Sequence, residues 1–256
     1  MARSSLQPQP EVRPAAVVVT AADDASSQKA RQLAHALQLP LQEHGGADAL
    51  HLVQTAARLE LHDPASDARL WVEFTPAELH RYRPGAAGRD LLRRALGAHA
   101  RSVIDATAGL GRDAVHLACL GYDVTAIERN RAVAALAHDG LERARSAGLI
   151  APGNPTWLIG DAHALLLTLA APDAIYLDPM FPPKRKKSAA VRKEMQLLRA
   201  LVAHDDDAAE LLALARRCAR SRVVVKRADD AAPLAPNPTA SYSGKLVRYD
   251  VYKTHD

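Results

Sequence analysis

Hydrophobic and polar positions change their spacing along the chain, and each change predicts an element. Residues 15–20 form a short apolar run, and residues 23–39 then place apolar side chains at helical intervals. Two runs in which apolar and polar positions alternate, residues 50–62 and 69–75, flank a turn-forming segment. These patterns predict a strand, a helix and a β-hairpin. Together they indicate a small α/β lobe over residues 1–80.

From residue 101 onward, apolar strands alternate with amphipathic helices, which predicts a doubly wound, mostly parallel sheet. A connector, residues 80–97, runs into the first helix of this region. The expected strands are residues 102–106, 122–127, 156–160, 174–178 and 222–226. The expected helices are residues 112–120, 130–147, 190–202 and 207–219. Residues 242–252 contain a turn followed by alternation, which predicts a last, antiparallel strand at the edge of the sheet.

The N-terminal end and the cysteines bear on where the protein works. Residues 1–14 are rich in proline and polar side chains, which predicts a disordered or loosely attached tail. The apolar run 15–22 is short and interrupted by Thr20, so an early strand explains it better than a signal peptide. No apolar stretch approaches the length of a membrane span. Cys119 and Cys218 have neither metal-ligand nor disulfide spacing, and we therefore expect a cytoplasmic protein.

Composition changes the picture only through the distribution of charge. The chain is 48% hydrophobic and 24% charged, as is ordinary for a globular protein, and its formal net charge is +4. A charge of this size is weak evidence for a polyanionic partner, and a local cluster of cations is stronger evidence. Aromatic residues make up only 4% of the chain, so an aromatic side chain in a loop is informative.

A glycine-rich turn follows the first strand of the second region. Gly109 and Gly111 allow the backbone to turn tightly and approach a ligand, towards which the next helix directs its N-terminus. Glu128 ends the second strand, where a carboxylate can accept both hydroxyls of a ribose. A two-glycine turn alone could be an ordinary strand-to-helix connection. Combined with Glu128, it predicts a cofactor that contains a nucleoside.

The same turn leaves two cofactors open. Gly109, Gly111 and Ala114 match a dinucleotide fingerprint, and Arg129 at the end of the second strand would suit a 2′-phosphate. Asp105, at the end of the first strand, favours S-adenosylmethionine (SAM), because an acid there commonly supports the loop and the methionine end of that cofactor in methyltransferases. On this segment alone, the balance leans modestly towards SAM.

The segment DPMFPP, residues 178–183, falls where a fourth parallel strand would end. It resembles the Asp/Asn-Pro-Pro-aromatic motif of methyltransferases that act on exocyclic amines of adenine or guanine, and Met180 is the departure from it. Asp178 and the carbonyl of Pro179 can accept hydrogen bonds from such an amine and favour the charge that develops on nitrogen. Phe181 offers a flat face on which a base can stack. An ordinary strand-ending turn is the alternative interpretation.

Five separated sequence blocks carry a more specific resemblance. They are DATAGLGRDA, ERN, YLDPMFP, KSAAVRKEM and RVVVKR, at residues 105–114, 128–130, 176–182, 187–195 and 222–227. In this order they resemble the ribosomal RNA small-subunit methyltransferase J family, over roughly residues 50–253. The resemblance implies a Rossmann-like class I SAM methyltransferase domain over residues 81–256. It also implies methyl transfer from SAM to N2 of one guanosine in 16S ribosomal RNA, in the hairpin near its 3′ end, so that this RNA or the small ribosomal subunit is the partner.

The resemblance also implies roles for single residues. Arg112 and Asp113 would contact the cofactor after the glycine turn, and Ala162 and His163 would lie by its adenine. Together with the glycine turn, the expected cofactor-binding residues are Asp105, Gly109, Gly111, Arg112, Asp113, Glu128, Arg129, Asp161, Ala162, His163 and Asp178. Asp178 would sit between the cofactor and the target amine.

Cations gather directly after DPMFPP. Phosphate contacts supply most of the affinity of proteins for nucleic acids, and this run lies beside the place where a base must enter. A solvated loop is the alternative interpretation. The expected RNA-binding residues are Lys184, Arg185, Lys186, Lys187, Arg192 and Lys193, with Lys226 and Arg227 at the end of the fifth strand. Residues 80–84, HRYRP, are either a second RNA contact or a linker with a docked Tyr82.

Other functions stay open at this point. The motif also suits an amino-methyltransferase acting on adenine or on DNA. The dinucleotide fingerprint and Arg129 suggest an NADP-dependent oxidoreductase, although the chain shows no Tyr-x-x-x-Lys proton donor. A non-catalytic RNA-binding module is the third alternative, against which the set of Asp105, Glu128 and Asp178 argues. No histidine pair has convincing metal-ligand spacing, and methyl transfer needs no metal. The sequence does not predict the oligomeric state.

Overall fold

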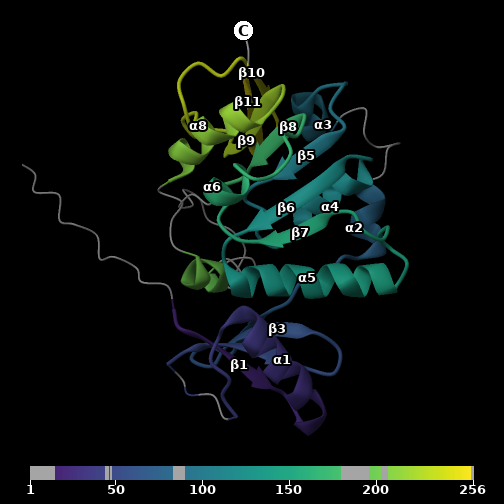
Figure 1. The fold of residues 1–256 in the computed structure, drawn as a ribbon, viewed down its shortest axis with the longest axis vertical. Helices are drawn as coiled ribbons and strands as arrows, with labels where there is room; N and C mark the ends of the chain where they lie inside the picture. The colour runs from purple at the N-terminus through teal and green to yellow at the C-terminus, as the bar shows by residue number, and fades with distance from the viewer. Residues whose placement is uncertain are drawn as a thin grey trace, which may run out of the picture.

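Two β-sheets with a long helix between them make up the computed structural model (Figure 1). The structure describes residues 15–43, 46, 48–82, 90–179, 196–202 and 207–254. The N-terminal sheet has the order β1-β2-β3-β4, in which β1 and β2 are parallel and the other neighbours are antiparallel. Its strands are β1 (Val17–Ala21), β2 (Leu50–Gln54), β3 (Leu59–Asp63) and β4 (Ala68–Leu70). The predicted first strand is therefore confirmed.

Helix α1 (Ser27–Leu37) follows β1, after a single 3₁₀ turn, η1 (Asp24–Ser26). The Asp23 side chain accepts a hydrogen bond from the Ser26 N–H at 2.8 Å and so caps this start. Ala30, Ala34 and Leu37 are buried, one helical turn apart. The helix predicted over residues 23–39 is confirmed in its position and its buried face.

The alternating run over residues 50–62 is two strands, so its prediction as one strand was wrong. The Thr55 hydroxyl accepts hydrogen bonds from the N–H groups of Ala57 and Arg58, at 3.2 and 3.0 Å. This local side-chain bonding closes a turn that pairs β2 with β3. The turn between β3 and β4 is where the sequence predicts it, but β4 ends at Leu70 and residues 71–75 are not a strand.

The second sheet has the order β10-β11-β9-β8-β5-β6-β7. Its strands are β5 (Ser102–Asp105), β6 (Asp123–Glu128), β7 (Thr156–Ile159), β8 (Ala174–Leu177), β9 (Arg222–Ala228), β10 (Ala240–Ser243) and β11 (Val247–Lys253). Within the group β5 to β9, neighbouring strands are parallel. Strand β11 runs antiparallel to β9 and to β10. All four residues of β8 are buried, as expected for a central parallel strand.

The predicted parallel sheet with an antiparallel last strand is confirmed, but the prediction that this last strand lies at the edge was wrong. Strand β10 pairs along the outer side of β11 and is itself the edge. The Ser241 hydroxyl donates a hydrogen bond to the Asp250 carboxylate at 2.6 Å across these two strands. Tyr249 to Tyr252 are buried in consequence. A short, polar strand is weak as a sequence signal, because its alternation is carried by serine and alanine.

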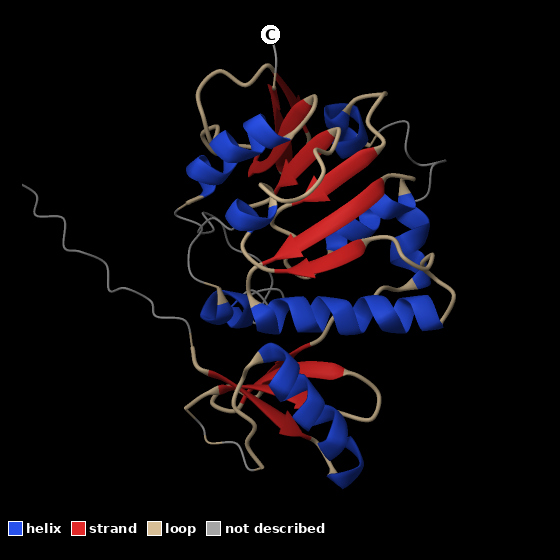
Figure 2. Ribbon diagram, viewed as in Figure 1, coloured by secondary structure: helices blue, strands red, loops and turns tan. Residues whose placement is uncertain are grey.

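Helices cover both faces of the second sheet (Figure 2). On one face, α3 (Leu91–Leu96) and α4 (Arg112–Cys119) pack on Val103, Val124 and Val224. On the other, α6 (Ala162–Leu165) and α8 (Ala208–Cys218) pack on Ile104, Ile175 and Val223. The sequence did not predict α6, which is only one turn long. Among the described residues, no helix combines the length and the apolar character that a membrane crossing requires.

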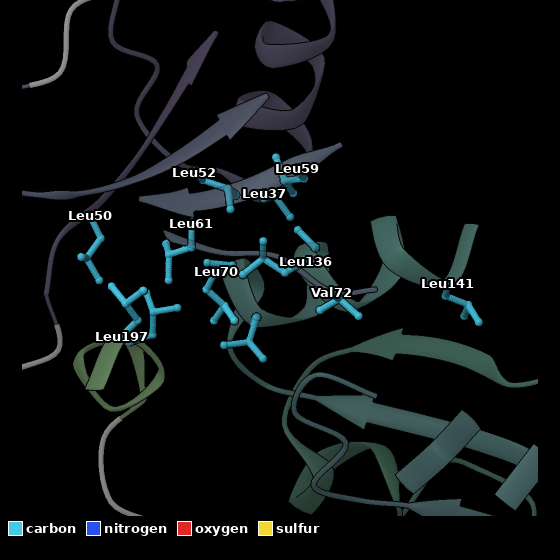
Figure 3. Close-up of a cluster of buried hydrophobic side chains, with 14 of the residues drawn as sticks. Leu37, Leu50, Leu52, Leu59, Leu61, Leu70, Val72, Leu136, Leu141 and Leu197 are labelled. Atoms are coloured by element: carbon cyan, nitrogen blue, oxygen red, sulfur yellow. The ribbon is translucent and has the colours of Figure 1, made fainter. Parts of the chain in front are cut away.

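Helix α5 (Arg131–Ser146) lies between the two sheets and contacts both β3 and β6 (Figure 1). Its apolar side chains, with Leu136 and Leu141 among them, share one buried cluster with the N-terminal strands (Figure 3). The helical segment 196–201 joins the same cluster through Leu197, which lies beside Leu50. One hydrophobic core therefore fixes the N-terminal sheet, α5 and this segment to one another.

Candidate active site

A pocket opens at the carboxyl ends of β5, β6, β7 and β8, the edge at which parallel sheets bind ligands. Eight of the residues that the sequence predicts as functional line it. They are Gly109, Glu128, Arg129, Asp161, Ala162, His163, Asp178 and Pro179. Leu198 and Val202, which follow the undescribed residues 180–195, contribute an apolar wall. The topology therefore brings together residues that are up to 93 positions apart in the chain, from Gly109 to Val202.

Glu128 holds the glycine turn in place. Its carboxylate accepts the N–H of Gly109 at 2.8 Å and the N–H of Asn130 at 2.7 Å. Gly109 has a φ of +54° and Gly111 a φ of +79°, in the left-handed region that favours glycine. A Cβ placed on Gly109 would meet no atom nearer than the Thr107 carbonyl oxygen, at 4.0 Å. Protein packing therefore leaves this position open towards the pocket, as the close approach of a ligand requires.

Gly111 is enclosed and has a different role. A Cβ there would lie 3.0 Å from the indole ring of Trp157, so packing as well as backbone conformation requires glycine. The residue that follows, Arg112, does not line the pocket. Its guanidinium donates a hydrogen bond to Glu78 at 2.6 Å on α2 (Pro76–Arg81). The cofactor contact predicted for Arg112 stays a prediction.

Tyr82 is docked against the protein. Its ring stacks on His116, with centroids 4.3 Å apart, and its hydroxyl donates to Glu78 at 3.2 Å. Burial, and then the charge of Glu78, raise the pKa of Tyr82 to about 12. His116 in turn lies 2.7 Å from an Asp90 carboxylate oxygen. These contacts favour the linker interpretation of HRYRP, of which residues 83 and 84 lie outside the described part of the chain.

Asp105 lies beneath the pocket and does not line it. Its side chain is 1% exposed and accepts the N–H of Thr107 at 3.2 Å. Burial, and then repulsion from Asp113, raise the pKa of Asp105 well above its ordinary value. Asp105 thus supports the loop that carries Thr107, whose hydroxyl accepts the N–H of Asp178 at 2.6 Å.

Asp113, Tyr176, Asp178 and Lys226 form one polar network. The Lys226 ammonium donates to Asp113 at 2.7 Å and to Asp178 at 2.8 Å. The Tyr176 hydroxyl donates to Asp113 at 2.7 Å. Burial opposes the ionisation of Asp113, but Lys226 and Tyr176 outweigh it and hold the pKa of Asp113 below its usual range. The cofactor contact predicted for Asp113 stays a prediction, because Asp113 does not line the pocket.

At the β6 and β7 side of the pocket, Arg129 donates a hydrogen bond to Asp207 at 2.8 Å. Asp161 caps α6 by accepting the N–H of His163 at 2.9 Å, and its carboxylate lies 3.1 Å from the ring Nδ1 of His163. The hydrogen bond from the His163 N–H, and then those from its ring, hold the pKa of Asp161 below its usual range. The Nε2 atom of His163 is buried without a hydrogen-bond partner among the described residues.

The predicted RNA contacts divide into two groups. Phe181 and the cations at 184–187, 192 and 193 lie outside the described residues. Arg227 is 9% exposed and donates to the Ala232 carbonyl at 3.0 Å, while burial, and then Arg248, lower its pKa. Lys226 directs its ammonium to two carboxylates, as described above. Their charges face protein groups, and the RNA contact predicted for Lys226 and Arg227 stays a prediction.

Three side chains of the site were missed in the sequence. Thr107, Tyr176 and Asp207 bond to Asp178, Asp113 and Arg129 respectively. Only Tyr176 gives a local signal, because a hydroxyl inside a fully buried strand needs a partner. Within the described ranges, no group of three or more His, Cys, Asp or Glu side chains could hold a metal ion.

The strand order, the antiparallel β11 and a pocket flanked by Glu128 and Asp178 define a class I SAM-dependent methyltransferase. A family model for SAM-dependent methyltransferases matches residues 32–254. A SAM-dependent methyltransferase from Neisseria gonorrhoeae has a crystal structure that superposes with a TM-score of 0.71 at 33% identity, over 93% of this chain and 96% of that one.

Curated relatives narrow the class. Ribosomal RNA small subunit methyltransferase J from Nitrosococcus oceani is 45% identical over 88% of this chain and 94% of its own length. The protein of the same name from Coxiella burnetii is 44% identical over 92% of this chain and 96% of its own length. The chain belongs to the ribosomal RNA small subunit methyltransferase J family. The family resemblance is confirmed, and the alternative of an NADP-dependent oxidoreductase is excluded.

The pocket fits SAM, the cofactor of this family. The open position at Gly109 leaves room for a ligand close to the backbone. Glu128 lines the pocket, and a carboxylate there can accept hydrogen bonds from ribose hydroxyls. His163 lines the same pocket, and Leu198 and Val202 offer apolar surface to a flat base.

Proposed function

We propose that the protein transfers a methyl group from SAM to the exocyclic N2 amine of a guanosine in 16S ribosomal RNA, in the hairpin near its 3′ end. The names of its curated relatives support small-subunit ribosomal RNA as the substrate. The observation that carries the chemistry is the position of Asp178. Its side chain lines the cofactor pocket and is 38% exposed, so it can face both the cofactor and a base that enters from outside.

SAM supplies a methyl group on a positively charged sulfur, and the sulfur leaves with the electron pair of the broken C–S bond as a thioether. The guanine amine is a poor nucleophile, because its lone pair is conjugated into the ring. Asp178 and the Pro179 carbonyl accept its N–H hydrogens and so direct the lone pair along the transfer axis. The carboxylate also favours the positive charge that develops on nitrogen. The new N–C bond leaves one excess proton, which passes to Asp178 or to water.

The remaining residues bind and orient. In this proposal Glu128 accepts the ribose hydroxyls, Gly109 gives the backbone room to approach the cofactor, and Ala162 and His163 flank the adenine. Phe181 stacks on the extruded guanine. The cations Lys184, Arg185, Lys186, Lys187, Arg192 and Lys193 contact RNA phosphates. An enzyme that modifies ribosomal RNA works where ribosomes assemble, so we place it in the cytoplasm.

Transfer of labelled methyl from SAM to small ribosomal subunits that lack the modification tests the proposal. Nucleoside analysis should recover N2-methylguanosine from the wild-type reaction. Asp178→Ala should lower kcat by about 100- to 1,000-fold, the range for removal of one group that stabilises a transition-state charge, and should bind SAM with nearly unchanged affinity. Asp178→Asn keeps one acceptor oxygen, so its kcat should fall less than that of Asp178→Ala.

The outcomes separate the parts of the proposal. Label recovered as N6-methyladenosine, or label transferred only to DNA, would show that the proposed substrate is wrong and that the enzyme class is right. Full activity of Asp178→Ala would contradict the role of Asp178. Absence of transfer despite SAM binding would direct the search to other RNAs.

A further inference from the structure

Lys226 forms an ion pair with Asp178, the proposed catalytic carboxylate, and a second ion pair with Asp113. It lies on β9, where it is partly buried between the buried residues Val225 and Arg227. Its side chain is 23% exposed, and both carboxylates that it contacts belong to other elements. Asp113 comes from the first turn of α4, and Asp178 follows β8. The lysine therefore joins three elements at the pocket edge of the sheet.

The surroundings of Lys226 are strongly acidic. The charges of Asp113 and Asp178 act on the buried Asp105 and on the hydroxyl groups of Tyr176 and Tyr249. Burial alone would lower the pKa of Lys226, but Asp178 and Asp113 raise it beyond its ordinary value. One ammonium therefore faces three carboxyl groups, and it keeps the carboxylates from repelling each other.

We propose that Lys226 is a positioning residue for methyl transfer, which holds the Asp178 carboxylate ionised and correctly oriented for the target amine. This inference rests on the proposed function and gives Lys226 a role other than phosphate binding. An ionised carboxylate only accepts hydrogen bonds, whereas a protonated one presents an O–H that competes with the amine N–H. The bond from Lys226 to Oδ2 and the bond from the Asp178 N–H to Thr107 fix the residue at two points.

Asp113 is the second anchor of this arrangement. Its Oδ2 atom receives both the Lys226 ammonium and the Tyr176 hydroxyl, and it stands in the first turn of α4, where a negative charge is favoured. Tyr176 lies on β8, two residues before Asp178. The lysine is thus held from the side of the glycine turn and from the strand that carries the acceptor. A loosely held lysine that reaches for RNA would not be bound on two sides.

The pH dependence of kcat tests the inference in Lys226→Met, with Lys226→Arg and the exposed Lys245→Met as comparisons. Lys226→Met should lower kcat about 10- to 100-fold, as expected for loss of a hydrogen bond to a charged group, and leave SAM affinity within a few-fold. The acidic limb of the kcat–pH profile of Lys226→Met should move to higher pH by about one to three units, because the carboxylates lose their nearby positive charge. Lys226→Arg should keep the wild-type limb, and Lys245→Met should match the wild type throughout.

A readout without turnover accompanies the kinetics. In protein labelled with ¹³C at the aspartate carboxyls, the carboxyl resonance that Asp178→Asn removes should titrate at higher pH in Lys226→Met than in the wild type. If Lys226→Met does not fold, Lys226→Arg carries the test: an acidic limb and a resonance displaced from the wild-type positions would overturn the inference.

Two results would reject the role of Lys226. One is an unchanged kcat and limb in Lys226→Met with a raised KM for RNA and a shallower salt dependence, which is the signature of a phosphate contact. The other is an unchanged titration of Asp178. A wild-type protein without activity would instead reject the proposed function. The titration of the Asp178 resonance would then still show whether Lys226 holds that carboxylate ionised.

Discussion

Gly140→Ala tests whether the segment that follows β4 packs closely against α5. Gly140 lies inside the helix, where alanine normally stabilises by about 1 kcal/mol relative to glycine. In this fold the added Cβ would lie 2.6 Å from Val72 Cγ1 and 2.9 Å from the Val72 carbonyl oxygen. Carbon atoms in good contact are about 3.5–4.0 Å apart, so the neighbour must move.

The cost of that movement exceeds the gain in helix propensity. Val72 is fully buried, and its carbonyl accepts a hydrogen bond from Arg143, which also pairs with Asp139 and Glu73. Overpacking a filled core costs about 1–3 kcal/mol, and disturbing a hydrogen bond adds about 0.5–1.5 kcal/mol. After subtraction of the propensity gain, we expect Gly140→Ala to lower the free energy of unfolding by about 1–3 kcal/mol.

Urea unfolding of Gly140→Ala, Val72→Ala and the double variant measures this cost. Val72→Ala removes the Cγ1 contact but keeps the Cβ, 2.8 Å from the added atom, and the carbonyl oxygen. The double variant should therefore regain part of the overpacking cost and be more stable than the sum of the two single changes predicts. A Gly140→Ala protein about 1 kcal/mol more stable than the wild type would show helix propensity alone. That result would refute the close contact between α5 and Val72 in the segment that follows β4.

Two further predictions concern one wall of the pocket and the buried carboxyl group of Asp105. Leu197→Ala should lower the free energy of unfolding by about 2–5 kcal/mol, because Leu197 is 4% exposed in the shared core. The same change should weaken SAM binding, because Leu198 and Val202 of the same segment line the pocket. Calorimetry that gave unchanged SAM affinity would contradict this link. The raised pKa of Asp105 means that the wild type loses stability as pH rises from about 4 towards the folded-state value, since the folded protein binds the proton more tightly. Asp105→Asn lacks this loss, so its Tm relative to that of the wild type should rise as pH increases above about 4, and a difference that stays constant with pH would contradict the reasoning.

Local sequence patterns were sufficient to predict those features that show within a single helix or strand. The alternation of apolar strands and amphipathic helices predicted the parallel sheet, because strand and helix periods differ and each shows in one short window. Glu128 and Asp178 could be predicted as pocket residues for a related reason. Each ends a parallel strand, and all such ends meet at the same edge of the sheet. The division of the chain at residue 80 stays a prediction.

Contacts between distant side chains could not be predicted in this way. Lys226, Tyr82 and Arg112 each carried a ligand-binding interpretation, and the structure gives each of them partners within the protein. Whether a cation meets a phosphate or a carboxylate depends on which strands are neighbours and which face each residue occupies. These are properties of the strand order, to which residues 48 to 113 positions apart contribute. The sequence by itself thus determined the elements, the family and the edge that binds ligands, while the tertiary structure decided which charges neutralise one another there.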